Sequence, residues 1–160
     1  MQTLFCDVDN TINNHFKRIK KWTDRNGKCN WKKAFLYNEI MKDKVLDGAK
    51  EAISHFACFY KIVFLTARNF PHAYNVTKDW LDKNNFIYDE IIVVKSSKEK
   101  LKYVIEPDCL FIDDLSRKHE INPPYTVWYN DVISELDRLN VNYEIFYNNW
   151  DYIVEKYLAC

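Results

Sequence analysis

The stretch Leu4-Phe5-Cys6-Asp7-Val8-Asp9-Asn10-Thr11-Ile12 decides the fold, because an apolar run stops there at two aspartates and a threonine. Residues 3–6 predict a buried strand, and the carboxyl end of such a strand is where open α/β sheets bind ligands. Asp7 and Asp9 share a face of an extended chain, where two carboxylates repel unless a cation lies between them or one takes a proton. Mg²⁺ suits this pair because it prefers oxygen ligands and few carboxylates. The same residues would also serve as a strand end with Asp9 as the N-cap of a following helix.

Strands and helices alternate along the rest of the chain. Apolar runs predict strands at 3–6, 61–66, 90–94, 109–113, 125–129 and 143–147. Helical spacing of apolar residues predicts helices at 49–56, around 76–81, at 96–105, 131–139 and 150–158. This alternation indicates an α/β fold with a parallel sheet flanked by helices on both faces. We expect residues 1–160 to form a single domain.

Residues 13–45 interrupt this alternation. They are rich in Asn and Lys, contain Trp22, Trp31 and Phe35, and are too long for a simple connection between a strand and a helix. We predict a helix around Trp31–Met41 and interpret the segment as a small insertion, or minimal cap, over the strand ends, where long loops often carry function. The alternative is a peripheral helix that only packs Trp31 and Phe35 against the core.

The composition excludes several classes of protein. The 23 basic and 23 acidic residues balance, so there is no bulk electrostatic case for nucleic-acid binding, although a local basic patch is compatible with these numbers. With two glycines and no G-x-x-x-x-G-K-[ST] motif, the chain is not a P-loop kinase. Five cysteines without a C-x-x-C pair indicate reduced thiols rather than a disulfide framework. No apolar stretch is long enough to span a membrane, so we expect a soluble, cytoplasmic protein without a membrane partner.

Polar residues follow three of the predicted strands. The first strand ends at Asp7, the second at Thr66 and the fourth at Asp113-Asp114. If these strands are parallel neighbours, their carboxyl ends meet at one edge of the sheet. A lysine after the third strand would join them, and there are three candidates: Lys95, Lys98 and Lys100. We prefer Lys98, because it lies just inside a capping box predicted at residues 96–99.

This set of groups fits the requirements of phosphoryl transfer. Asp7 would attack phosphorus, with its charge offset by Mg²⁺ and a lysine. Asp9 would protonate the leaving oxygen and then activate water. Thr66 and Lys98 would hold the phosphoryl oxygens, and Asp113-Asp114 would bind the metal. Taken singly, each residue also fits a structural role as a strand end, a helix cap or a solvated charge.

The set resembles the haloacid dehalogenase (HAD) superfamily of phosphotransferases over residues 3–115. Asp7-Val8-Asp9-Asn10-Thr11 is similar to its first motif, D-x-D-x-T, while Thr66, Lys98 and Asp113-Asp114 are similar to the second, third and fourth. The resemblance implies a Rossmann-like core, an aspartyl-phosphate on Asp7, and Mg²⁺ bound by Asp7, the backbone carbonyl of Asp9, Asp113 and Asp114.

A closer resemblance involves the second strand end. Thr66-Ala67-Arg68 followed by Thr77-x-x-Trp80-Leu81 resembles the [ST]-x-R…T-x-x-W-[LV] pattern in the 3′-phosphatase domain of phage polynucleotide kinases. It implies a substrate phosphate near Arg68 and Asn14-His15. Together with the first motif, it leads us to expect four substrate-binding residues: Asn10, Thr11, His15 and Arg68. Asn10 replaces the usual glycine of the first motif, and the insertion at 13–45 belongs to this chain.

Three functions follow from this sequence. The leading hypothesis is a Mg²⁺-dependent phosphomonoesterase that acts on a nucleotide or a nucleic-acid 3′-phosphate. The alternative enzyme is a 5′(3′)-nucleotidase for free nucleotides, and in either case the aromatic insertion would stack a base. The alternative from another class is a non-catalytic module that uses the acidic site only to bind a metal or a partner. The sequence does not indicate an oligomeric state.

Overall fold

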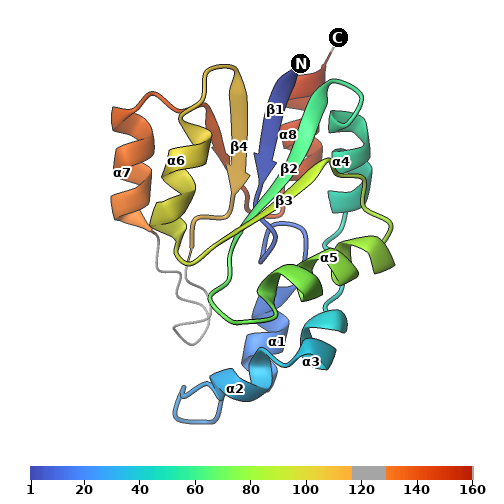
Figure 1. The fold of residues 1–160 in the computed structure, drawn as a ribbon, viewed down its shortest axis with the longest axis vertical. Coiled ribbons are helices and arrows are strands. Elements are labelled where there is room, and N and C mark those ends of the chain that lie inside the picture. Colours follow the sequence, from blue (N-terminus) through green and yellow to red (C-terminus); the bar gives the residue numbers. More distant parts are fainter. Residues whose placement is uncertain (117–128, 160) are drawn as a thin grey trace.

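The computed structural model describes residues 1–116 and 129–159, and its centre is a five-stranded, entirely parallel sheet (Figure 1). The strand order is β3-β2-β1-β4-β5. The strands are β1 (Gln2–Cys6), β2 (Tyr60–Ala67), β3 (Glu90–Val94), β4 (Cys109–Asp113) and β5 (Tyr143–Ile145). The predicted α/β class and flanked parallel sheet are therefore confirmed.

The helices of the described residues are short, and none of them has the length and apolar character needed to cross a membrane. They are α1 (His15–Lys21), α2 (Trp31–Ala34), α3 (Tyr37–Met41), α4 (Ala49–Phe56), α5 (Ala73–Lys83), the 3₁₀ turn η1 (Ser97–Lys100), α6 (Leu101–Val104), α7 (Asn130–Arg138) and α8 (Trp150–Leu158).

Each face of the sheet carries its own hydrophobic core. Successive residues of the strands point to opposite faces, so Leu4 and Cys6 lie in one core and Phe5 in the other. The first core is covered by α4, α5 and α8, and the second by α6 and α7 (Figure 1). Burial on both faces explains why β1, β2 and β4 are continuous apolar runs rather than alternating ones.

The sheet topology brings the predicted site residues to one edge. β1 pairs with β2 on one side and with β4 on the other, and Cys6 is in register with Phe64 and Ile112. The residue after Cys6 is Asp7, and the residue after Ile112 is Asp113, so the two carboxylates lie on neighbouring strands at the same level. The three polar strand ends therefore meet because β1 is central.

Residues 13–45 form α1, α2 and α3, which lie beyond the carboxyl ends of the strands (Figure 1). The single helix predicted around Trp31–Met41 is wrong, since the chain becomes extended at Leu36 (φ −62°, ψ 143°) and divides it into α2 and α3. These helices are attached to α5. Tyr37 donates a 2.5 Å hydrogen bond to Asp79, and the Trp80 indole donates a 2.9 Å bond to the carbonyl of Asp43.

Most element boundaries lie within two residues of the prediction. The exceptions besides α2 and α3 are α5, which begins three residues before the predicted 76–81, the helix predicted at 96–105, which is divided into η1 and α6, α1, which the sequence does not predict, and the strand predicted at 125–129. Residues 125–128 lie outside the described residues, and Tyr129 is the N-cap of α7 rather than part of a strand.

Trp150 connects the last helix to the loop that follows β1. Its buried indole donates a 2.9 Å hydrogen bond to the carbonyl of Thr11. We expect Trp150→Phe to lower the free energy of unfolding by roughly 1–3 kcal/mol, because it leaves that buried carbonyl without a donor. Tyr152→Phe on the exposed side of the same helix is the control, expected within about 0.5 kcal/mol of the wild type. Urea unfolding of both variants measures this, and equal midpoints would contradict it.

Candidate active site

The carboxylate of Asp7, at the end of β1, is held from two sides. Lys100 Nζ lies 2.8 Å from Asp7 Oδ1 and 2.7 Å from Asp113 Oδ2. The hydroxyl of Thr11 donates a 3.1 Å hydrogen bond to Asp7 Oδ2. Burial and then the nearby Asp113 raise the pKa of Asp7 to about 7, while Lys100 acts in the opposite direction. Asp7 is therefore a fixed, buried carboxylate whose negative charge is only partly compensated.

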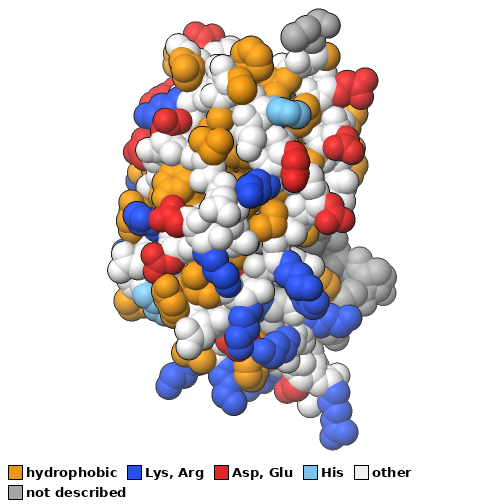
Figure 2. Space-filling view, turned by 90° about the vertical axis from the view of Figure 1, so that its right-hand side faces the viewer, with side chains coloured by type: hydrophobic (Ala, Val, Ile, Leu, Met, Phe, Trp, Pro, Cys, Tyr) orange, Lys and Arg blue, Asp and Glu red, His pale blue; other side chains and the backbone are white. Residues whose placement is uncertain are grey.

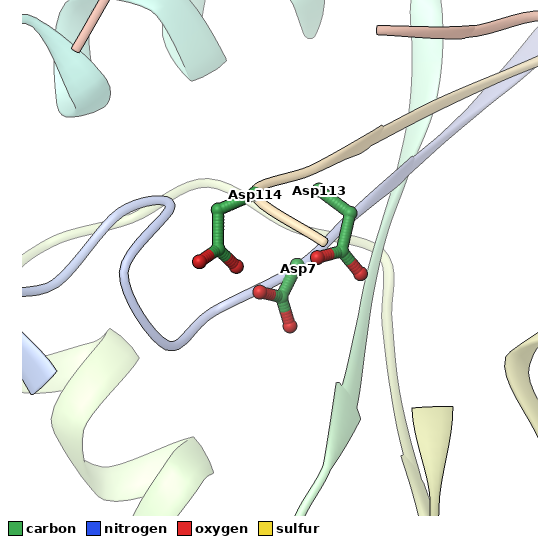
Figure 3. A group of neighbouring side chains, drawn as sticks. All are labelled: Asp7, Asp113 and Asp114. Carbon is green, nitrogen blue, oxygen red and sulfur yellow. The ribbon is translucent and has the colours of Figure 1, made fainter. Parts of the chain in front are cut away.

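Three carboxylates converge at this edge and fit a metal site. One oxygen from each of Asp7, Asp113 and Asp114 lies within 4.8 Å of the others, and the three side chains point toward one another (Figure 3). All three residues are buried, and Lys100 pairs with two of them, Asp7 and Asp113. Three carboxylate oxygens this close together suit a hard divalent cation such as Mg²⁺.

Lys100, not Lys98, is the lysine beside Asp7, so the preference for Lys98 was wrong in its choice of residue. Lys98 is exposed at the rim of the site, whereas Lys100 is buried. The physical reason is local. Residues 97–100 form a 3₁₀ turn rather than the first turn of an α-helix, and the Ser96 side chain makes no capping bond. Although burial alone would lower it, the contacts with Asp113 and Asp7 hold the pKa of Lys100 above its usual value.

Asp9 is held by basic side chains from two parts of the chain. Arg68 donates from Nε to Asp9 Oδ2 at 3.1 Å and from Nη2 to Oδ1 at 2.8 Å, and His15 Nδ1 lies 3.2 Å from Oδ1. Burial alone would raise the pKa of Asp9, but Arg68 and His15 outweigh it and hold the pKa well below its ordinary range. Asp9 is therefore ionised in this arrangement, and Arg68 and His15, both predicted to bind substrate, lie against it.

Asn10 and Thr11 shape the loop between the two aspartates and α1. Asn10 has a φ of +61°, in the left-handed region where glycine is favoured and asparagine is tolerated, which explains why this residue can replace the usual glycine. Thr11 is fully buried, and its hydroxyl also accepts a 3.2 Å bond from the backbone N–H of Asp114. Thr11 thus positions Asp7 and Asp114 rather than lining the cavity where we expected it to bind substrate.

Thr66 is close to the site but does not line the cavity. Its hydroxyl is buried and has no hydrogen-bond partner among the described residues. An unsatisfied buried hydroxyl is unfavourable, and it leaves Thr66 with a donor available at the end of β2.

A buried network that the sequence did not indicate connects α1 to this site. Arg18 Nε donates to both oxygens of Asp43 at 3.0 and 3.2 Å, and its Nη1 donates to the carbonyl of Ala34 at 2.7 Å. Arg18 Nη2 lies 2.7 Å from His15 Nδ1 and 3.8 Å from Asp9 Oδ1. No spacing rule singles out Arg18, since it stands in a run of basic residues and its partner lies 25 residues further on.

A cavity of about 830 Å³ opens over these groups. Its inner end is formed by Asp7, Asp9, Arg68 and the acidic pair. Its outer wall is aromatic. Trp31 stacks on Phe35 with ring centroids 5.9 Å apart, and the centroid of the Phe70 ring lies 5.3 Å from that of Phe35. A volume of this size is typical of sites for small organic ligands and exceeds the needs of a phosphoryl group alone.

No protein-family model matches the chain, and no curated protein matches it in sequence. Two solved structures are similar in fold. One is a chain of the Pnkp1/Rnl/Hen1 complex, with a TM-score of 0.56, and the other is a chain of the Pnkp1/Rnl/Hen1 RNA repair complex, with a TM-score of 0.55. Both are 16% identical to this chain and align with 90% of it, but with only 45% and 42% of their own length. This chain therefore shares their fold and spans less than half of either.

The three-carboxylate group predicts a divalent-cation site. We expect Mg²⁺ at a concentration of a hundred times its dissociation constant to raise the free energy of unfolding of the wild type by about 2.7 kcal/mol. The thermal unfolding midpoint should rise accordingly. Asp114→Asn should lower the affinity for Mg²⁺ at least about tenfold. Loss of a residue that only supports a metal ligand already costs about that much, and Asp114 would be a ligand itself.

Calorimetric titration of Mg²⁺ and Mn²⁺ checks the affinity. Asp131→Asn is the matched control, because Asp131 lines the same cavity but stands apart from the three carboxylates. Equal cation affinity in Asp114→Asn and Asp131→Asn would contradict the site.

Proposed function

We propose that this protein is a Mg²⁺-dependent phosphomonoesterase that works through an aspartyl-phosphate on Asp7. The observation that carries the proposal is the Asp7 carboxylate, fixed by Lys100 and Thr11 at the inner end of a cavity, beside two further carboxylates. A positioned carboxylate with a nearby cation is what nucleophilic attack on a phosphate ester requires.

The reaction follows in two displacements. An oxygen of Asp7 attacks phosphorus, a new P–O bond forms, and the bond to the ester oxygen breaks. Asp9, after taking up a proton from solvent when the bound phosphate draws Arg68 away, gives that proton to the leaving oxygen, so an alcohol departs. Asp9 then takes a proton from a water molecule, which attacks the same phosphorus and releases inorganic phosphate and free Asp7. Mg²⁺, when bound by Asp7, Asp113, Asp114 and the backbone carbonyl of Asp9, supplies charge neutralisation for the phosphoryl oxygens.

The contacts of Asp9 explain how substrate would prepare it for proton transfer. Arg68 pairs with Asp9 at 2.8 Å, and this pairing keeps Asp9 ionised. A phosphate dianion in the cavity competes for the same guanidinium, because bidentate pairing with phosphate is a strong interaction of arginine. Drawing Arg68 toward the phosphate would leave Asp9 more basic, and thus able to carry a proton.

Lys100 and Thr66 complete the proposed phosphate site. The Lys100 ammonium offsets the charge of Asp7 during attack, and Thr66 has a buried donor without a partner among the described residues. The proposal therefore gives Lys100 the role that the sequence assigned to Lys98.

The proposed substrate is a nucleic-acid end with a 3′-phosphate. Two observations support it over a small metabolite: the fold is shared with components of an RNA repair complex, and the cavity has an aromatic wall on which a base would stack. A free nucleotide also fits an aromatic wall, so a nucleotidase is the second candidate.

Asp7→Asn is expected to lower hydrolysis of p-nitrophenyl phosphate at least about a thousandfold, because it removes the nucleophile. Asp47→Asn, at an exposed position outside the site, is the control. The readout is phosphate release with Mg²⁺, for p-nitrophenyl phosphate, mononucleotides and 3′-phosphorylated oligonucleotides. Substantial activity in Asp7→Asn would overturn the mechanism, and turnover of mononucleotides alone would favour the nucleotidase.

The roles of Lys98 and Lys100 can be separated by substitution. We expect Lys100→Met to lower kcat by about 100-fold or more, the effect of removing one preorganised charge from a transition state. Lys102→Met, on the exposed side of α6, should have wild-type kcat. Steady-state kinetics with p-nitrophenyl phosphate checks both. An active Lys100→Met enzyme together with an inactive Lys98→Met enzyme would restore the original prediction.

A further inference from the structure

The charge of this protein is strongly segregated along the chain. Residues 13–45 contain ten Lys or Arg and three Asp or Glu, whereas the other residues contain thirteen basic and twenty acidic ones. The formal net charge of zero therefore hides a segment of +7 within a remainder of −7. Such a segment is the electrostatic signature of a surface for a polyanion, which the total charge does not reveal.

Most basic residues of this segment are exposed to solvent and form no ion pair within the part of the chain that the structure describes. Nine of the ten are exposed, and Arg18 is the buried exception. Lys21 and Lys42 pair with Glu39. The seven others make no ion pair among the described residues: Lys17, Lys20, Arg25, Lys28, Lys32, Lys33 and Lys44. In Figure 2, Lys and Arg side chains gather on the lower part of the molecule, at the level of α1, α2 and α3 in Figure 1.

An exposed aromatic ring lies where this basic surface meets the cavity. Trp31 is 45% exposed, stacks on Phe35 at an interplanar angle of 28°, and lines the cavity together with Lys32. Phe35 is in turn supported by the Arg18 guanidinium, 5.0 Å above its ring, and by Phe70. Proteins that bind single-stranded nucleic acid combine partly exposed aromatic rings, on which unpaired bases stack, with neighbouring lysines that neutralise the phosphate backbone.

We propose that residues 13–45 form a docking surface for single-stranded nucleic acid, with the last base on Trp31 and the preceding phosphates on the lysines of α1 and α2. This inference rests on the proposed function, because the phosphatase site defines which end of the strand enters the cavity. The insertion then acts as the part of the site that selects a polynucleotide over a free nucleotide, since a mononucleotide has no further phosphates for these lysines.

The aromatic contact favours a single strand over the other polyanions. The internal bases of a duplex are stacked on one another, so only its terminal pair could lie on Trp31, whereas every base of a single strand can. An anionic membrane surface would also attract lysines. The same segment, however, borders a cavity lined by carboxylates, which a flat lipid surface would not fill.

Fluorescence anisotropy of labelled 12-nucleotide strands, DNA and RNA, tests the surface directly. The strands carry a 3′-hydroxyl, so no hydrolysis is needed, and the full chain is used. We expect binding whose logarithm falls linearly with the logarithm of salt concentration, with a slope of about −0.7 for each neutralised phosphate.

Two sets of variants separate stacking from charge. Trp31→Ala should weaken binding about 5- to 150-fold with an unchanged salt slope, as expected for loss of one stacked base. The double variant Lys32→Ala/Lys33→Ala should make the slope shallower by about 0.7 for each lysine that contacts a phosphate. Lys61→Ala/Lys156→Ala is the control, because both lysines lie outside the insertion and pair with glutamates. Circular dichroism and thermal midpoints verify folding.

Three results would overturn the docking surface. They are no binding of either strand, an equal loss of strand affinity in the control variant, and binding of phosphatidylserine vesicles but of neither strand. These results are distinguishable from failure of the proposed function. A wild type that hydrolyses p-nitrophenyl phosphate but binds no strand refutes only the surface. A wild type that binds strands through Trp31 but hydrolyses no phosphomonoester refutes the phosphatase.

Discussion

The arrangement of the site depends on one buried ammonium group shared by two carboxylates. Lys100 joins Asp7 at the end of β1 to Asp113 at the end of β4, so it ties the two central strands to the turn that follows β3. Burying three carboxylates and a lysine is costly, because each charge loses its hydration, and removal of one partner leaves the others uncompensated. Such a cluster adds little to stability, and it keeps three carboxylate oxygens close together, an arrangement that fits a divalent cation.

A second polar network joins the insertion to the core. Asp9 lies between Arg68 from the end of β2 and His15 from α1, while Arg18 connects α1 to Asp43. Because α3 is also attached to α5, the insertion is held in place over the strand ends by hydrogen bonds as well as by apolar packing. The wall of the cavity therefore rests on a segment fixed by hydrogen bonds, as the precise positioning of a functional site requires.

Charges of opposite sign are concentrated in two parts of the molecule. Carboxylates lie at the inner end of the cavity, where three of them fit a cation site. Lysines dominate the insertion outside it, where a polyanion would be attracted and oriented at long range. A balanced total charge is the result of this division and says nothing about either part alone.

The sequence by itself determined the α/β class, the boundaries of β1 to β4, and the convergence of Asp7, Thr66 and Asp113-Asp114 on one edge, because buried parallel strands are continuous apolar runs and their ends are readable. Only the tertiary structure decided which lysine meets Asp7, since a 3₁₀ turn has about 3.0 residues per turn and an α-helix about 3.6, so the two place the successive side chains of residues 97–100 in different directions. It also decided that Thr11 positions rather than lines the site, that α2 and α3 are separate, and that Arg18 pairs with Asp43. These features depend on contacts between residues distant in the chain, and hydrophobic periodicity carries no information about them.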